Sequence, residues 1–236
     1  LKLQGATPLL VGIGLGIYGL TQALCQLPLG AVSDHISRRT VIIFGFSIFM
    51  LGSLLAALST NIFLMILGRA LQGAGAVGSV LTALLMDLTT EPKRPKAMAF
   101  IGLLIGCTFF LALLLGPVLG HFIGLQGVFW GSVGLSLLAI LIALTLPAQP
   151  FSPAKLSKAP RPHLGQLFCK PQLFILNLGI FCLHSLLTTS FVALPFLLAQ
   201  RFPHQAAWQI YLPVFAIAIL LTFALLGWSE KRKRTS

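Results

Sequence analysis

A single arginine, Arg69, lies inside a long apolar stretch that runs from Ile62 to Leu88. It stands seven residues into that stretch, roughly 10 Å along a helix at about 1.5 Å per residue. A charge at that depth of a bilayer costs at least ~2.5 kcal/mol unless it faces a polar interior, so Arg69 is a candidate functional residue. Gln72 shares its helical face. The alternative is a structural arginine that caps carbonyl groups of neighbouring helices.

A second polar cluster occupies the stretch from Gly30 to Arg39, which reads GAVSDHISRR. Asp34 and Arg38 are four residues apart, the spacing at which a helix brings opposite charges together. Gly30 allows a neighbouring helix to approach closely. From the spacing alone, an ordinary basic loop that holds one acid is an equally good interpretation.

His184 lies about eleven residues into another apolar stretch, with Asn177 and Thr188 on the same helical face. Histidine titrates near neutral pH, so a histidine inside a membrane could carry protons. A neutral histidine that is hydrogen-bonded to a helix neighbour fits the same pattern.

Gly116 and Pro117 precede Gly120 near the end of the apolar stretch 97–122. Pro117 removes a backbone hydrogen bond and is expected to bend the helix, and the glycines, with Gly102 upstream, allow tight packing at the bend. A Gly-Pro pair is common in membrane helices, so this motif gains weight only from the other motifs.

The composition places all of these residues in a membrane protein. The chain is 57% hydrophobic and 8% charged, with a mean hydropathy of +0.97, whereas soluble domains carry roughly 25% charged residues. The net charge of +12 does not indicate nucleic-acid binding. The basic residues fall in short clusters between apolar blocks, which is typical of cytoplasmic loops.

The sequence predicts an all-α membrane protein of about seven transmembrane helices, because a span needs about 20 mostly apolar residues. The predicted spans are Leu9–Leu29, Val41–Leu58, Ile62–Leu88, Ala97–Phe122, Val128–Leu146, Leu173–Leu198 and Gln209–Trp228. Thirteen of the sixteen Lys and Arg residues lie in the connections on one side and in the C-terminal tail. The positive-inside rule therefore predicts a cytoplasmic tail and an N-terminus outside.

One connection, from Pro147 to Gln172, is long, basic and rich in proline. Prolines oppose helix formation and favour an extended linker, here on the cytoplasmic side. The predicted organisation is an N-terminal bundle over 1–146, a linker over 147–172, and two helices of a second bundle with a basic tail over 173–236. A two-halved transporter has this organisation.

Three of these stretches, in this order, resemble signatures of the major facilitator superfamily. Gly30–Ile42 resembles its loop signature G-x-x-x-D-[RK]-x-G-[RK]-[RK], and Arg69–Gly75 resembles its R-x-x-Q-G-x-G. Gly116–Gly120 resembles the G-P-x-x-G of the drug/proton antiporter branch. The stretches GIYGLTQA, GRALQG, KAMAFIG and FVALP are similar to YajR-type bacterial antiporters. The resemblance covers nearly the whole chain and implies a truncated bundle, from the family's second helix to its eighth.

The resemblance also implies roles for the residues. In similar proteins the loop signature forms a gating latch with an acid at the end of the fourth family helix. The latch residues would be Gly30, Asp34, Arg38, Arg39 and Asp87. Proton coupling or a polar interior would involve Arg69, Gln72 and His184, and the antiporter helix bend Gly116, Pro117 and Gly120.

The implied function is proton-coupled efflux of drug-like or other small amphipathic molecules by alternating access. The implied location is a bacterial inner membrane, and the protein would be monomeric when complete. We expect the 236-residue chain by itself not to transport, because the family's first helix and last four have no counterpart in it. A non-transporting remnant that only inserts in the membrane is therefore the serious alternative.

Two positions depart from the loop signature. His35 stands where the signature prefers Arg or Lys, and Ser37 stands where it prefers Gly. Serine lacks the easy access of glycine to positive φ, so we expect a strained or differently shaped turn at Ser37.

Other classes of protein fit less well. A retinal protein needs a lysine within its last helix, and Gln209–Trp228 has none; receptors lack these loop and Gly-Pro signatures. An enzyme needs convergent acids or a nucleophile with its base, whereas the four acids lie near helix ends or in loops. The four cysteines have no metal-ligand spacing, so we expect no metal site, disulfide or cofactor.

Overall fold

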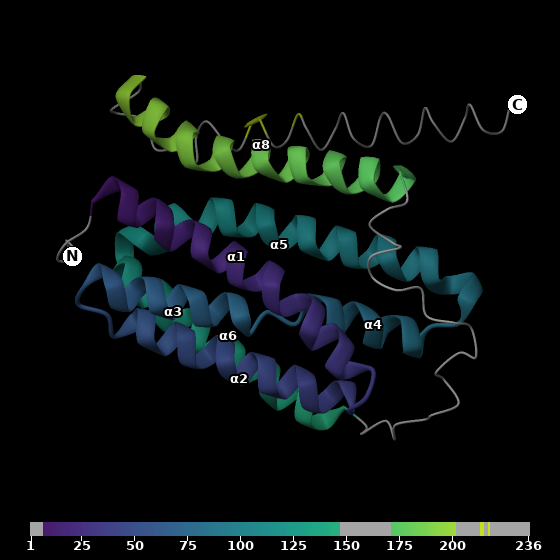
Figure 1. Cartoon of the computed structure of the whole chain (residues 1–236). Coiled ribbons are helices and arrows are strands. Elements are labelled where there is room, and N and C mark those ends of the chain that lie inside the picture. The colour runs from purple at the N-terminus through teal and green to yellow at the C-terminus, as the bar shows by residue number, and fades with distance from the viewer. Residues whose placement is uncertain (1–6, 147–170, 202–212, 215–216, 218–236) are drawn as a thin grey trace, which may run out of the picture. The chain divides into compact units, whose positions relative to one another are not determined.

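The structure is a computed structural model that describes residues 7–146, 171–201, 213–214 and 217 (Figure 1). All regular secondary structure in these residues is helical. The chain divides into two compact units, Leu1–Ser152 and Pro153–Ser236. The interpretation of 1–146 and 173–236 as parts of two bundles joined by a linker stays a prediction, and residues 147–170 of that linker lie outside the described residues.

The first unit is a bundle of helices joined by short connections (Figure 1). Its helices are α1 (Pro8–Ser33), α2 (Arg38–Ala57), α3 (Ile62–Ala74), α4 (Gly78–Leu88), α5 (Arg94–Phe122) and α6 (Gly124–Thr145), with a short 3-10 turn, η1 (Glu91–Lys93), before α5. In the second unit, α8 runs from Pro171 to Arg201. The protein is therefore an all-α membrane protein, as the sequence predicts.

Five segments of the described chain are long and apolar enough to cross a membrane, which confirms the first five predicted spans. They are Leu9–Ser33, Arg38–Ala57, Ile62–Leu88, Glu91–Ala112 and Gly124–Thr145. The sixth predicted span, 173–198, falls within α8. The seventh, 209–228, lies outside the described residues except for 213, 214 and 217.

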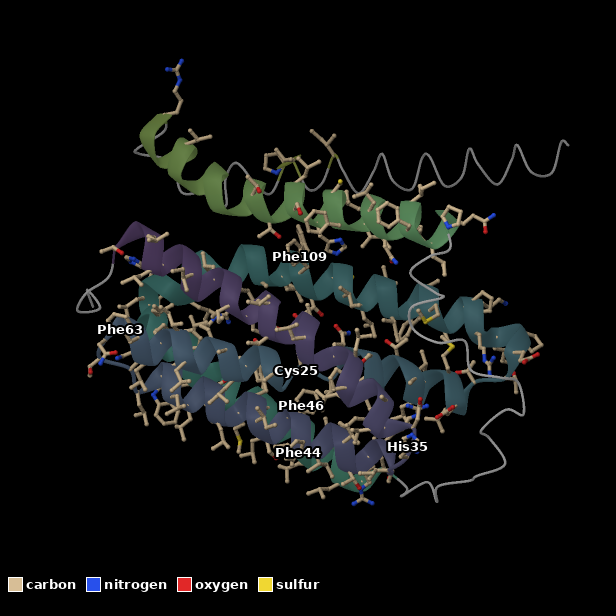
Figure 2. All side chains as sticks on the ribbon, in the orientation of Figure 1. Cys25, His35, Phe44, Phe46, Phe63 and Phe109 are labelled. Atoms are coloured by element: carbon tan, nitrogen blue, oxygen red, sulfur yellow. The ribbon has the colours of Figure 1, made fainter. Side chains whose placement is uncertain are left out.

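Large apolar side chains cover the outside of the first unit. Phe44 of α2 is 58% exposed and Phe63 of α3 is 68% exposed (Figure 2). Such residues need no protein cover in a bilayer, since lipid tails are as apolar as they are. The exposed surface therefore agrees with a membrane environment.

Helices α2 and α3 pack against each other with glycine facing glycine. A Cβ atom added at Gly52 would lie 2.6 Å from Gly68 O, and one added at Gly68 would lie 2.7 Å from Gly52 O. Likewise, a Cβ atom added at Gly75 would lie 2.5 Å from Gly45 O. Only glycine fits at such distances, and its absent side chain lets the two backbones approach closely. We call these four residues the glycine seam.

The predicted span Ile62–Leu88 is interrupted in the middle, which the sequence analysis did not predict. Helix α3 ends at Ala74 and α4 begins at Gly78. Glycine is a poor helix former, and the stretch Gly73–Gly78 contains three glycines. Gly75, at the C-terminal end of α3, also lies close against the backbone of α2. The interruption therefore lies at one end of the glycine seam.

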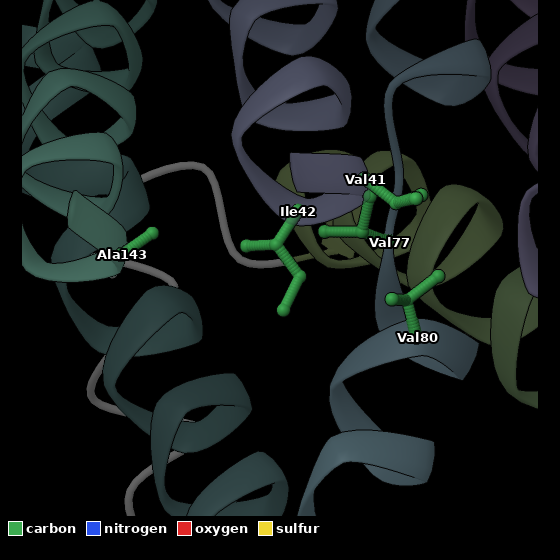
Figure 3. Close-up of a cluster of buried hydrophobic side chains, with 5 residues drawn as sticks. All are labelled: Val41, Ile42, Val77, Val80 and Ala143. Carbon is green, nitrogen blue, oxygen red and sulfur yellow. The ribbon is translucent and has the colours of Figure 1, made fainter. Parts of the chain in front are cut away.

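Val77, inside this interruption, belongs to a buried apolar cluster (Figure 3). The other members are Val41 and Ile42 from α2, Val80 from α4 and Ala143 from α6. A second cluster, nearer the opposite ends of the helices, combines Ala56, Ala57, Met65 and Phe129. Together the two clusters bring α2, α3, α4 and α6 into one packed group.

Helix α5 runs without interruption from Arg94 to Phe122. Within the first unit, no described atom would lie within 4 Å of a Cβ atom added at Gly102, Gly106, Gly116 or Gly120. These glycines lie on exposed faces of α5, and the tight packing expected around them stays a prediction. The helix bend at Pro117 stays a prediction.

Candidate functional site

Arg38 is the centre of a polar cluster at one end of the first unit. Its Nε donates to Asp87 Oδ2 at 2.5 Å, and its Nη2 donates to Asp34 Oδ1 at 3.3 Å. Its Nη1 donates to Ser33 Oγ at 2.9 Å, and this hydroxyl donates in turn to Gly30 O at 2.7 Å. The cluster therefore ties together the end of α1, the start of α2 and the end of α4. We call this the basic end of the unit.

The folding of the α1–α2 connection explains how the cluster forms. Helix α1 ends at Ser33, Asp34 is its C-cap, and α2 begins at Arg38. The four-residue spacing therefore predicts the ion pair correctly, but the pair bridges a turn and does not lie within one helix. Asp87, near the end of α4, is the partner that only the family resemblance indicates.

Two other members of the predicted latch have different environments. Arg39 Nη2 donates to Leu144 O at 2.7 Å, in the last turn of α6, where a cation interacts favourably with the helix dipole. Arg39 therefore ties α2 to α6. A Cβ atom added at Gly30 would lie 3.7 Å from Ser79 Oγ, an ordinary contact, so the close approach expected at Gly30 is wrong.

Of the two outcomes expected at Ser37, a strained turn or a differently shaped one, the strained turn is wrong. Ser37 has φ −54° and ψ 126°, and no described non-glycine residue has positive φ. The turn therefore accommodates serine without the conformation that favours glycine. Its Oγ atom is buried and has no hydrogen-bond partner among the described residues.

Arg69 lies on α3, away from the basic end, and contacts two neutral side chains. Its guanidinium carbon is 4.6 Å from the centroid of the Tyr18 ring, a cation–π distance. Its Nη1 donates to Gln72 Oε1 at 2.8 Å. The sequence prediction that Gln72 shares the face of Arg69 is confirmed. Arg69 contacts side chains in this arrangement, and the alternative of an arginine that caps carbonyl groups finds no support in these contacts.

Gln72 continues this network into α2. It is 1% exposed, and its Nε2 donates to Ser53 Oγ at 2.8 Å. Ser53 is fully buried, and its hydroxyl donates to Phe49 O at 2.8 Å. Each hydroxyl has one hydrogen to donate. The Ser53 hydroxyl donates its hydrogen to Phe49 O, so its oxygen accepts from Nε2 of Gln72. The amide oxygen of Gln72 therefore faces Arg69.

Tyr18 and Ser53 are two site residues that the sequence analysis missed. Ser53 is a small polar residue in an otherwise apolar span, and its position next to Gly52 of the glycine seam was a signal that could have found it. Tyr18 comes close because Gly73 of α3 lies against the α1 backbone, where an added Cβ atom would be 3.0 Å from Tyr18 C. Only the packing of α3 on α1 reveals that contact.

His184 belongs to the second unit. Its Nδ1 lies 2.9 Å from Ile180 O, one turn earlier in α8, and the residue is exposed. Asn177 and Thr188 are exposed as well. The described contact of His184 is thus one with its own helix, the arrangement that the alternative interpretation of this residue expects, and a role in proton coupling stays a prediction.

Comparison with known proteins identifies a matching family and several similar proteins. A family model described as Major Facilitator Superfamily matches residues 2–236. Inner membrane transport protein YajR of Escherichia coli (strain K12) is 43% identical over 99% of this chain and 52% of its own length. An uncharacterized transporter of Buchnera aphidicola subsp. Schizaphis graminum is 36% identical over 83% of this chain and 51% of its own length.

A more distant relative is the class B tetracycline resistance protein of Escherichia coli. It is 34% identical over 48% of this chain and 27% of its own length. The chain spans about half the length of the first two relatives. The resemblance to YajR-type transporters that the short sequence stretches predict is confirmed.

Proposed function

The chain belongs to the Major Facilitator Superfamily, and we propose that it acts as a secondary active transporter that exports drug-like or other small amphipathic molecules in exchange for protons. Alternating access in such transporters moves two helix bundles about a central site. The relation to a tetracycline resistance protein supports a drug-like substrate. We further propose a bacterial inner membrane as its location, with the basic end in the cytoplasm.

The observation that carries this proposal is the partly buried network around Arg69. A charge inside a membrane span is costly, and such residues mark substrate or proton pathways. Arg69 is held by Tyr18 from α1 and, through Gln72, by Ser53 from α2. The arrangement positions a permanent positive charge among neutral groups, where it can respond to a nearby proton or to a charged substrate.

The cluster around Arg38 supports the gating part of the proposal. Its bonds to Asp34 and Asp87 hold together three helix ends, so breaking them would change the balance between conformations. A residue of this kind biases a conformational equilibrium and does not contact the substrate. We therefore propose that this cluster is the gating latch.

The direct test is transport in proteoliposomes with an imposed proton gradient and a panel of fluorescent drug-like molecules. The chain is tested by itself and joined to the segments of the E. coli relative that flank its matched region. We expect gradient-dependent uptake above that of empty liposomes in at least one of the two proteins. Arg69→Ala should abolish that uptake with insertion retained, whereas Phe63→Ala, an exposed residue of the same helix, should not.

The same assay tests a second candidate function, that of a membrane protein that inserts in the bilayer and does not transport. Insertion of both proteins into liposomes, without gradient-dependent uptake of any compound, would favour this candidate. Uptake that survives Arg69→Ala would instead mean that transport does not use the Arg69 network.

A further inference from the structure

The charge of Arg69 has no acidic partner in the described structure. The described ion pairs all lie near the basic end, where Arg38 binds Asp34 and Asp87, and Arg94 lies 3.7 Å from Glu91. A buried charge without an opposite charge nearby is expensive. The Arg69 environment is therefore suited to a ligand that brings the negative charge with it.

The described contacts leave most of the guanidinium edge available. A guanidinium has five N–H donors, and the structure assigns one described hydrogen bond to it, from Nη1 to Gln72. The contact with Tyr18 is a cation–π contact over the tyrosine ring and adds no described hydrogen bond. Arg69 is also only partly buried. The described part of the chain thus leaves donors for a second acceptor.

The Gln72–Ser53 network keeps this arrangement from collapsing. Turning the Gln72 amide would break the bond to Arg69 and the bond to Ser53 at once. Gln72 is buried, so no water would replace the lost bonds, and unmade bonds there are costly. Gln72 therefore holds Arg69 in place with a neutral oxygen and does not cancel its charge.

From this geometry we propose that Arg69 binds the carboxylate of an amphipathic organic acid. A planar guanidinium matches a carboxylate through two parallel hydrogen bonds, and the surrounding α1 and α3 side chains are mostly apolar, which suits an apolar body. The identification of this acid as the cargo rests on the proposed transport function. The binding itself does not.

Binding is tested with the 236-residue chain in nanodiscs of neutral lipid, by ¹⁹F NMR of 4-fluorobenzoate. The matched neutral probe is 4-fluorobenzamide, which has nearly the same shape. We expect saturable line broadening for the acid. The amide should bind at least roughly tenfold more weakly than the acid, the size of effect that a charge-assisted hydrogen bond gives.

Three variants locate the site. Arg69→Gln should weaken benzoate binding roughly tenfold or more, whereas Arg69→Lys should retain part of it. Gln72→Glu places a carboxylate beside Arg69 and should also remove benzoate binding, although the charge of residue 69 is unchanged. Arg94→Gln, at the basic end, should leave benzoate binding unaltered, because Arg94 pairs with Glu91 and has no role in the proposed site. Circular dichroism and size exclusion check that each variant is folded.

Equal broadening of benzoate and benzamide would overturn the inference, as would unaltered benzoate binding in Gln72→Glu. The transport assay separates this failure from failure of the proposed function. Gradient-dependent transport without Arg69-dependent benzoate binding would overturn the inference alone. Benzoate binding that depends on Arg69, in a protein without gradient-dependent transport, would overturn the proposed function alone.

Discussion

Asp87 and Asp34 bind the same arginine but differ in distance and exposure. The Arg38–Asp87 pair is 2.5 Å long and the acid side chain is 30% exposed, whereas the Arg38–Asp34 pair is 3.3 Å long and its acid is 45% exposed. Water and ions weaken exposed pairs more than sheltered ones. The two acids should therefore contribute unequally to the stability of the basic end.

We predict that Asp87→Asn lowers the free energy of unfolding by about 1–2 kcal/mol and that Asp34→Asn lowers it by less than about 1 kcal/mol. Thermal unfolding of the detergent-solubilised chain measures both. Because Asp87 and Arg38 bind each other directly, the effects of Asp87→Asn and Arg38→Ala should be less than additive. Additive losses would mean that Asp87 and Arg38 do not form this ion pair in solution.

Two serines of the same turn should behave in opposite ways. Ser33 Oγ accepts from Arg38 and donates to Gly30 O, so Ser33→Ala should lower the free energy of unfolding by about 1 kcal/mol. Ser37 Oγ is buried without a described partner, so Ser37→Ala should be neutral or slightly stabilising. A loss of stability in Ser37→Ala similar to that in Ser33→Ala would contradict this difference.

Among the helices, the contact of α2 with α3 depends on glycines that differ in environment from Gly134 of α6. Gly52→Ala or Gly68→Ala would push a Cβ atom into the backbone of the other helix, and overpacking of this kind costs about 1–3 kcal/mol. At Gly134 of α6, no described atom would lie within 4 Å of an added Cβ. Gly134→Ala should therefore be neutral or gain up to about 1 kcal/mol from helix propensity.

Thermal unfolding of these three variants, compared with the unchanged chain, checks the prediction. Equal effects at Gly52 and Gly134 would show that helix propensity, and not the close approach of α2 and α3, decides the outcome. Double substitution of Gly52 and Gly68 tests the same contact from both sides, and it should be non-additive because the two residues face each other.

The helices differ in how well the sequence predicts them. Hydropathy alone locates the spans that become α1, α2, α5 and α6, because lipid selects long apolar segments whatever their packing. It misses the interruption between α3 and α4, since the composition of 62–88 stays apolar across the break. That break arises where Gly75 meets α2, a tertiary contact that no hydropathy profile contains.

The candidate site shows the same division. Arg69, Gln72 and Asp34 could be predicted because a polar residue in an apolar context, or an acid four residues before an arginine, is visible in the sequence. Tyr18 and Leu144 O could not, because their roles depend on which helices pack together. Gly30 was predicted for a close approach that the structure places at other glycines.

For the whole molecule, the distribution of basic residues predicts which side of the membrane each connection faces. Cysteine substitutions at Ser157 and Thr235 should react only with reagents on the cytoplasmic side, and one at Thr60 only with reagents on the outside. Thr60 is preferred to Asn61 because Asn61 Oδ1 accepts from Leu64 N at 2.8 Å and caps α3. The native cysteines are first replaced, and labelling uses a membrane-impermeant maleimide on oriented vesicles.

Labelling of residues 60 and 157 from the same side would contradict the predicted orientation. It would not contradict the helical bundle, whose packing does not depend on which way the chain faces. The measurement therefore tests the charge rule separately from the fold.

The glycine seam also determines which parts of the first unit can move. Sliding α2 along α3 would move side chains that flank the seam, such as Ala56 and Leu71, toward the place where backbone now meets backbone. The interface between α2 and α3 should therefore resist sliding, since packed interfaces switch between discrete arrangements and do not deform smoothly. Helices α2 and α3 should therefore move together as a rigid body. Spin labels placed on the two helices should keep a constant separation when the protein changes conformation.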